Sequence, residues 1–193
     1  ATVTAGAVTV EAHEQVVLRS LLDATVTSSG GSAYGSGTSL AANGVISTNS
    51  LLSQASAYVS NSHLKVSGDV SVTATNTAKV EAINNSLVNT GDTGVAVMLA
   101  FNTIGWTPNN TLFDTLNALL QTDIGTQEVM TVKAYLENTS AEVSGALSVV
   151  ASNASTLLAK ASNGVTSAAS ALVNAGGKAA TGLLVSNMVS SDT

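Results

Sequence analysis

The sequence repeats itself, and this repetition constrains the fold more than any other feature. A glycine followed by alternating valines and small residues begins at Gly6 and returns at Gly68 and Gly145. A second phrase, centred on Tyr58, returns at Tyr135, as far along the chain as Gly145 lies from Gly68. Copies of a unit that recur along a chain usually stack on one another, so the repetition predicts a solenoid.

The two steps between the glycines differ in length. The step from Gly68 to Gly145 is longer than the step from Gly6 to Gly68. We place the excess in a helical insert at residues 107–127, because apolar residues recur at helical spacing from Leu112 to Ile124. Pro108, the only proline of the chain, precedes side chains that can cap a helix. The insert therefore predicts one amphipathic helix inside a β repeat.

The predicted fold class is all-β, a parallel β-helix or solenoid that forms a single segment over residues 1–193. Its repeat units span about 6–67, 68–144 and 145–193, the last being partial. A unit of this length divides into about three coils of about twenty residues, whose strands would pair in parallel about 4.8 Å apart. Alternating patterns predict strands at Val8–Ala12, Val16–Leu22, Ala41–Ile46, Ala55–Val59, Val70–Ala74, Ala78–Ile83, Gly94–Phe101, Thr131–Leu136, Leu147–Ala151 and Thr156–Ala161.

The composition is that of a scaffold more than of a compact enzyme. The 193 residues are 45% hydrophobic but only 3% aromatic and 9% charged, against about 25% charged in an ordinary domain. The net charge of −6 and the scattered Lys and Arg residues argue against nucleic-acid binding. The longest apolar stretch, Val95–Phe101, has the length of a strand and not of a membrane span. Without cysteine the chain has neither disulfides nor thiolate metal sites.

Three phrases resemble a known family. Leu99–Trp106, Lys133–Thr139 and Gly68–Ala74 are similar to phrases in long bacterial surface proteins of the filamentous hemagglutinin-like or leukotoxin-like adhesin type. The resemblance covers nearly the whole chain, helical insert included, and implies a right-handed parallel β-helix on a cell surface. It implies no catalytic motif. The first copy departs from the pattern at Ser28–Gly37, where a Gly- and Ser-rich loop replaces a strand.

The two histidines, His13 and His63, are the first candidates for a metal site. Glu11 and Glu14 flank His13, but on a strand Glu11 shares the face of His13 whereas Glu14 points to the other side. Only one carboxylate could then join His13, so the pattern favours a solvated edge. We predict no metal-binding residues.

The carboxylates could instead serve a sugar hydrolase or a calcium-assisted lyase, which needs acidic residues at one lateral position on adjacent coils. The aligned copies contain no such acidic column, so we predict no catalytic and no cofactor-binding residues. The alignment sets Asp69 beside Ala7 and Ala146, Glu137 beside Ser60, and Glu11 beside Val72 and Val149.

Tyr58 and Tyr135 occupy one position of the unit, where they form either a surface column that stacks sugars or a buried ladder. Apolar neighbours on the same strands favour the buried ladder. Trp106 and Phe113 bracket the insert and are expected to hold the helix over an open face of the stack, or to contact a partner.

Asparagine recurs after apolar runs, at Asn43, Asn102 and Asn187. Asparagine tolerates a left-handed turn and can also form an internal ladder of amides between coils. Either role concerns folding and not chemistry.

The sequence thus predicts a non-catalytic structural segment of an extracellular bacterial adhesin or surface filament. The expected partners are like subunits or adjacent repeats that stack end to end, and possible glycans of host or matrix; nucleic acid, cofactors and membrane insertion are not expected. Because the chain starts and stops inside repeats, we expect a segment of a longer protein. The alternatives are a carbohydrate-binding or carbohydrate-active β-helix and a binding module at an adhesin tip.

Overall fold

The computed structural model describes residues 1–29, 39–105, 129–167 and 177–193. Within these ranges the protein is all-β, with no helix and with four parallel sheets. The predicted helix at 107–127 lies outside the described residues, as do Trp106 and Phe113. The same holds for residues 30–38, which make up most of the predicted loop.

The chain passes through the four sheets in the same order three times, and each pass is one coil of a solenoid. The first coil holds β1 (Thr2–Ala5), β2 (Val8–Ser28), β3 (Leu40–Leu51) and β4 (Gln54–Ser60). The middle coil holds β5 (His63–Val66), β6 (Val70–Thr90), β7 (Thr93–Ile104) and β8 (Met130–Glu137). The third coil holds β9 (Ser140–Val143), β10 (Leu147–Asn153), β11 (Thr156–Ser167), β12 (Lys178–Val189) and β13 (Ser191–Asp192).

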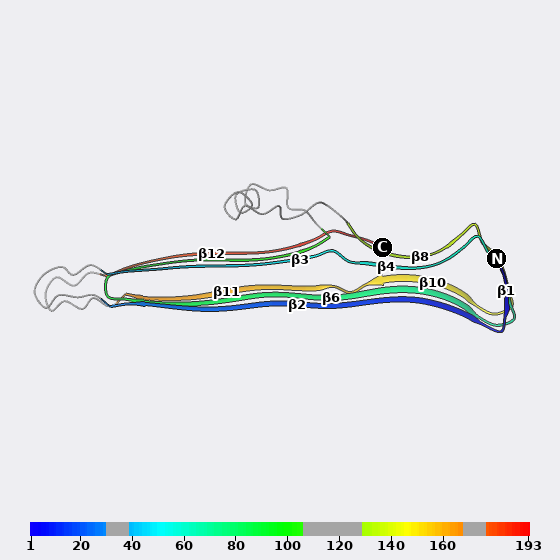
Figure 1. The fold of residues 1–193 in the computed structure, drawn as a ribbon, viewed down its shortest axis with the longest axis horizontal. Helices are drawn as coiled ribbons and strands as arrows, with labels where there is room; N and C mark the ends of the chain where they lie inside the picture. Colours follow the sequence, from blue (N-terminus) through cyan, green and yellow to red (C-terminus); the bar gives the residue numbers. More distant parts are fainter. Residues whose placement is uncertain (30–38, 106–128, 168–176) are drawn as a thin grey trace, which may run out of the picture.

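The coils are flat and long (Figure 1). One layer is the long sheet, in which β6 lies between β2 and the pair β10 and β11. The facing layer holds two sheets, β3–β7–β12 and β4–β8–β13. The short sheet β1–β5–β9, here called the end sheet, joins the two layers at one end of the molecule.

The register of the long sheet confirms the spacing of the sequence repeat. Every pair along β2 and β6, from Val8 with Val70 to Ser28 with Thr90, has the separation of Gly6 from Gly68. Pairs between β6 and β11, such as Thr156 with Lys79, have the separation of Gly68 from Gly145. The prediction of three coils per unit is wrong, because β2 and β6 are single strands of 21 residues and a whole unit completes only one turn.

The greater length of the second unit is the net result of two loops that differ in opposite directions. Paired residues are closer in sequence along β3 and β7, as in Leu40 with Thr93, than along β2 and β6. They are farthest apart along β4 and β8, as in Gln54 with Thr131. The first coil therefore has the longer loop before β3, and the middle coil has the longer loop before β8. The residues predicted to form the helical insert, to which we assigned the whole excess, lie in the connection before β8 and so account for only the second difference.

The predicted strands all fall within observed strands, which are longer. Val8–Ala12 and Val16–Leu22 are parts of the continuous β2, and two predicted strands likewise merge in β6. Polar residues such as His13 and Thr75 interrupt the apolar pattern but keep the register, because they point outward and leave the main-chain ladder intact.

The core is a thin layer of small apolar side chains between the two layers. Val72 and Ala74 of β6 pack against Val132 of β8 in the same coil and against Ala55 and Ala57 of β4 in the first coil, and all five are buried. Alternate residues of β6 point to the outside. A core of Ala and Val accounts for the apolar but not bulky composition.

Candidate interaction surfaces

The recurring glycines lie where the end sheet meets the long sheet, and there neighbouring coils approach closely. A Cβ at Gly68 would lie 2.5 Å from the carbonyl oxygen of Gly6. A Cβ at Gly145 would lie 2.6 Å from the carbonyl carbon of Gly68 and would also meet the Asp69 side chain. No side chain fits at either position, so the approach of the preceding coil requires glycine. At Gly6 itself nothing lies within 4 Å.

A groove of about 690 Å³ runs across all three coils beside these glycines. Among the described residues, the charged ones that line it are Lys65 and Glu142, and its hydroxyls come from Thr4, Ser67 and Ser144. Sugar hydrolysis by the common mechanism needs two carboxylates across the substrate. The lining supplies one, so the groove offers contacts to a ligand but not a pair of catalytic acids.

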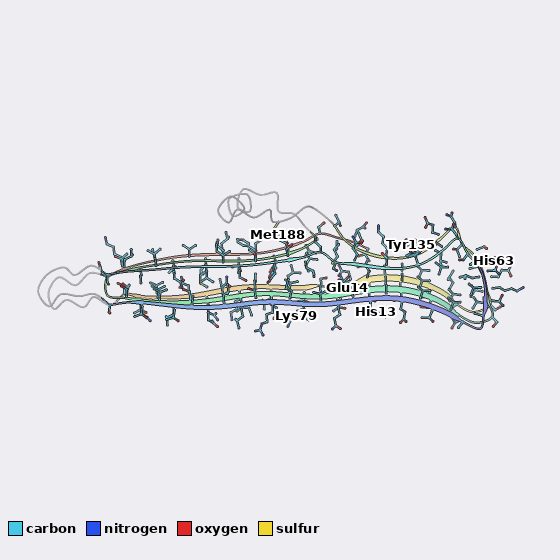
Figure 2. All side chains as sticks on the ribbon, in the orientation of Figure 1. His13, Glu14, His63, Lys79, Tyr135 and Met188 are labelled. Carbon is cyan, nitrogen blue, oxygen red and sulfur yellow. The ribbon has the colours of Figure 1, made fainter. Side chains whose placement is uncertain are left out.

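His13 lies on the outer surface of the long sheet, with one carboxylate near it. Its Nε2 is 3.3 Å from Glu11 Oε2, and its Nδ1 is 2.5 Å from Thr75 Oγ1. Glu14 points between the layers, where it accepts a hydrogen bond of 3.0 Å from the main-chain amide of Gln54 (Figure 2). The prediction that only Glu11 joins His13 is confirmed.

His63 lies on the end sheet. Its Nδ1 is 2.5 Å from Ser140 Oγ, and its Nε2 is 3.8 Å from Glu142 Oε1. In the part of the chain that the structure describes, no group of three or more His, Cys, Asp or Glu residues is arranged to hold a metal ion.

Carboxylates do not align from coil to coil in the described strands. Glu137 pairs with Ser60, as predicted. Glu11 pairs with Thr73, and not with Val72 as the sequence alignment had it. Asp69 has a structural role, because its carboxylate accepts a hydrogen bond of 2.8 Å from the Ala146 main-chain amide of the next coil.

One ionic cluster ties the first coil to the middle coil on the outer face of the long sheet. The Glu81 carboxylate accepts from Lys79 Nζ at 2.9 Å and lies 3.4 Å from Arg19 Nε, its neighbour on β2. The hydrogen bond from Lys79 is the main cause that holds the pKa of Glu81 below its ordinary value. Desolvation opposes it, and the charges of Lys79 and Arg19 lower the pKa further.

Tyr58 and Tyr135 stack, with ring centroids 5.2 Å apart and ring planes 7° from parallel. The prediction that this ladder is buried is wrong, since Tyr58 is 51% exposed. Along β4 the side chains alternate, and Ala57 and Val59 take the inward positions on either side. The pair is a column on the outer surface.

An amide ladder runs through the core, which is one of the two roles expected of the recurring asparagines, but with one different member. Asn49 Nδ2 donates to Asn102 Oδ1, and Asn102 Nδ2 donates to Asn187 Oδ1, both at 2.9 Å. Asn43, predicted for this ladder, pairs in register with Ala96 and donates instead to Ser86. The loop before β3 shifts the register away from the phrase alignment, and Asn49 takes the place.

The two ladder amides that donate, those of Asn49 and Asn102, also cross the core to the long sheet of the next coil. Asn49 Nδ2 donates to the Glu81 carbonyl at 2.9 Å, and Asn102 Nδ2 donates to the Leu158 carbonyl at 2.8 Å. Glu81 and Leu158 are register neighbours. The pattern is therefore the same at both steps, and every donation points from a coil to its successor.

Two further asparagines, missed in the sequence, shape the turns into the end sheet. Asn61 and Asn138 have φ angles of 49° and 47°, in the left-handed region that asparagine tolerates. Their common place in the phrases around Tyr58 and Tyr135 was the available signal.

No helix of the described residues has the length and apolar character of a membrane span. The chain matches no protein-family model, no curated protein and no solved structure.

Proposed function

We propose that the chain is a non-catalytic structural segment of an extracellular bacterial adhesin or surface fibre. One observation carries the proposal: the columns that recur in register are those of the scaffold. They are the glycines where the sheets meet, the inward apolar residues and the core asparagines. Charged residues change from coil to coil, as in the column of Arg19, Glu81 and Leu158.

The proposed role is mechanical. Parallel ladders join each coil to the next along strands of up to 21 residues, and such a continuous stack resists bending and local unfolding. We expect the winding to be right-handed, as parallel crossover connections are. The insert at 107–127 remains a predicted helix beside the stack.

The proposed location is the bacterial cell surface, with like subunits or adjacent repeats as partners. The few charges and the many Ser, Thr and Asn residues give a weakly charged, hydroxyl-rich exterior. The similarity to bacterial adhesin repeats supports this location.

A carbohydrate-binding or carbohydrate-active β-helix is the second candidate. The groove lined by Lys65 and Glu142 and the exposed ring of Tyr58 favour it, because both lie on lateral faces that a long polymer can reach. The single carboxylate of the groove favours binding over turnover.

A polysaccharide screen separates the two candidates. The purified chain is incubated with neutral and acidic polysaccharides, with and without Ca²⁺, and new reducing or unsaturated ends are measured. We expect no turnover; turnover that Glu142→Gln abolishes would reject the structural role. Saturable glycan binding that Tyr58→Ala removes, and that Tyr135→Phe retains, would support the binding module.

A further inference from the structure

The third coil presents apolar residues that belong to a core. Five inward residues of β10 and β12 are 42–52% exposed, whereas their register neighbours in the middle coil are 0% exposed. Each exposed residue continues a buried column. The exposed residues are Leu147, Val149, Leu183, Val185 and Val189; the buried ones are Val70, Val72, Met98, Ala100 and Ile104.

We propose that the third coil of one copy stacks on the first coil of a second copy, head to tail, in the register that joins coils within one copy. The inference rests on the proposed function and deepens it, since it names the partner, the polarity and the register. The occupant is a first coil because its inward residues continue the same columns, with Val8 and Val10 in line with Leu147 and Val149. The interface would extend one that the chain already forms twice.

The amide ladder gives the stack its polarity. Among the described residues, Asn187 Nδ2 donates to no partner and Asn49 Oδ1 accepts from none, whereas Asn102 between them does both. In the proposed stack Asn187 Nδ2 donates to Asn49 Oδ1 of the second copy. It also donates to that copy's Arg19 carbonyl, which is in register with Glu81 and Leu158. Two third coils face to face would bring donors against donors.

Gly6 supplies an independent argument. Among the described residues of one copy nothing requires glycine there, because a Cβ would meet none of their atoms within 4 Å. Its counterparts Gly68 and Gly145 are glycine because the preceding coil approaches them. In the proposed stack the coil before Gly6 is the third coil of another copy, whose Gly145 carbonyl would occupy that space.

The charges are compatible with this register. Lys160 would lie beside Leu21, and Glu142 beside Thr4, since each pair shares a register neighbour in the middle coil. No like charges of the described strands would meet. Glu14, whose carboxylate points inward, would lie beside Asn153. The Asn153 amide can donate to it, which offsets part of the cost of burying a carboxylate.

Association is tested on the purified 193-residue chain by sedimentation velocity over a range of concentrations, with electron microscopy of the assemblies. We expect a ladder of linear species and filaments one copy wide. Gly6→Ala should raise the concentration for half-association at least tenfold, because the new methyl group meets the neighbouring carbonyl. Gly44→Ala is its control, since Gly44 also has nothing within 4 Å but lies on the outer face of β3.

A second variant addresses the ladder. Asn187→Asp keeps the acceptor for Asn102 but replaces the donor by a carboxylate facing the Asn49 oxygen, so association should again weaken at least tenfold. Asn89→Asp adds the same charge on the outer face of β6 and should leave association unchanged. Circular dichroism and melting of dilute samples establish that all four variants fold as single copies.

Cross-linking tests the register. Thr9 and Ser148 both pair with Ser71, so they lie two coils apart in one copy but would be adjacent across the interface. In this cysteine-free chain, Thr9→Cys with Ser148→Cys should give intermolecular ladders on oxidation, whereas Thr9→Cys with Thr166→Cys should not.

Three results would overturn the inference. One is a chain that stays monomeric at every concentration. Another is association that survives both Gly6→Ala and Asn187→Asp but is lost in Val97→Lys, since this would place the contact on the outer face of β7. The third is equal cross-linking of the two cysteine pairs. A monomeric chain without polysaccharide turnover would leave the proposed structural role standing, whereas turnover by a stacking chain would reject that role alone.

Discussion

The middle coil and the third coil place the same kinds of side chain at the same positions, yet only the middle coil buries them. Met98 and Leu183 are register neighbours; the first is buried and the second is half exposed. In a globular core a residue is covered by elements from all sides. In this solenoid it is covered by the coil before and the coil after, so burial depends on position in the stack more than on residue type.

Polar groups follow the same rule. Asn102 is buried with both neighbours of its ladder in place, whereas Asn187 is exposed with only one. The comparison implies that equal substitutions should cost much in the middle coil and little at either end.

The losses in the free energy of unfolding caused by Met98→Ala and by Leu183→Ala should differ the most. Removing a buried methionine leaves a cavity and should lower the free energy of unfolding by about 2–5 kcal/mol. Leu183→Ala should cost less than about 1 kcal/mol in the single copy, because much of its side chain is already in water. Urea unfolding of dilute samples measures both. Equal losses of unfolding free energy would mean that the third coil is already covered in dilute solution. The same measurement at protein concentrations at which copies stack would then show whether a second copy covers it.

The same comparison for polar residues sets the loss of stability in Asn102→Ala against that in Asn187→Ala. Asn102→Ala removes the acceptor of Asn49 and leaves the Leu158 carbonyl without its core donor, so we expect a loss of about 1–3 kcal/mol. Asn187→Ala removes one bond at an exposed position and should cost about 1 kcal/mol or less. Thermal unfolding followed by circular dichroism compares them. A larger loss for Asn187 than for Asn102 would contradict the ladder as described.

The effects of Gly68→Ala and Gly6→Ala on stability extend the comparison to the first coil, at the other end of the stack. At Gly68 the new methyl group would be pressed against the Gly6 carbonyl, and the forced shift of the main chain should cost about 1–3 kcal/mol. At Gly6 the methyl group enters open space, and the stiffer unfolded chain should leave the single copy unchanged or more stable by about 0.4–1 kcal/mol. Melting temperatures at low concentration test the sign of the difference.

The sequence predicted the register of the long sheet because repeated phrases are the register neighbours themselves. The predicted register is wrong wherever the connection between two repeated phrases differs in length from coil to coil. The repeated phrases indicated Asn43 and missed Asn49, because no residue marks how far the connection before β3 shifts the register. The size of the coil also escaped prediction, since polar residues inside β2 look like turns when only side chains are read.

It was harder to predict which residues are buried and which are exposed than to predict the strand register. Tyr58 has apolar neighbours on its strand, which suggested burial on both faces, but those neighbours alone fill the inner layer. The open third coil carries no sequence signal at all. Its residues match those of a core, and only the arrangement in space shows that nothing described covers them.

The ionic cluster at Glu81 should have the smallest effect on stability. It distinguishes the interface of the middle coil with the first coil from its interface with the third coil. Toward the first coil Glu81 faces Arg19, but toward the third coil its register neighbour is Leu158. Because the pKa of Glu81 is lowered in the folded chain from an ordinary value of 4.5, the folded state binds fewer protons than the unfolded state at this site. Its stabilisation is therefore present above the ordinary value and is lost as the pH falls through the lowered pKa.

Melting temperatures between pH 3 and pH 6 should show a slope in this window that Glu81→Gln reduces. Lys79→Gln should reduce the slope more than Arg19→Gln does, since the hydrogen bond from Lys79 is the main cause of the shift. A larger effect of Arg19→Gln would mean that contact between the first two coils, and not the bond within β6, sets the charge of Glu81.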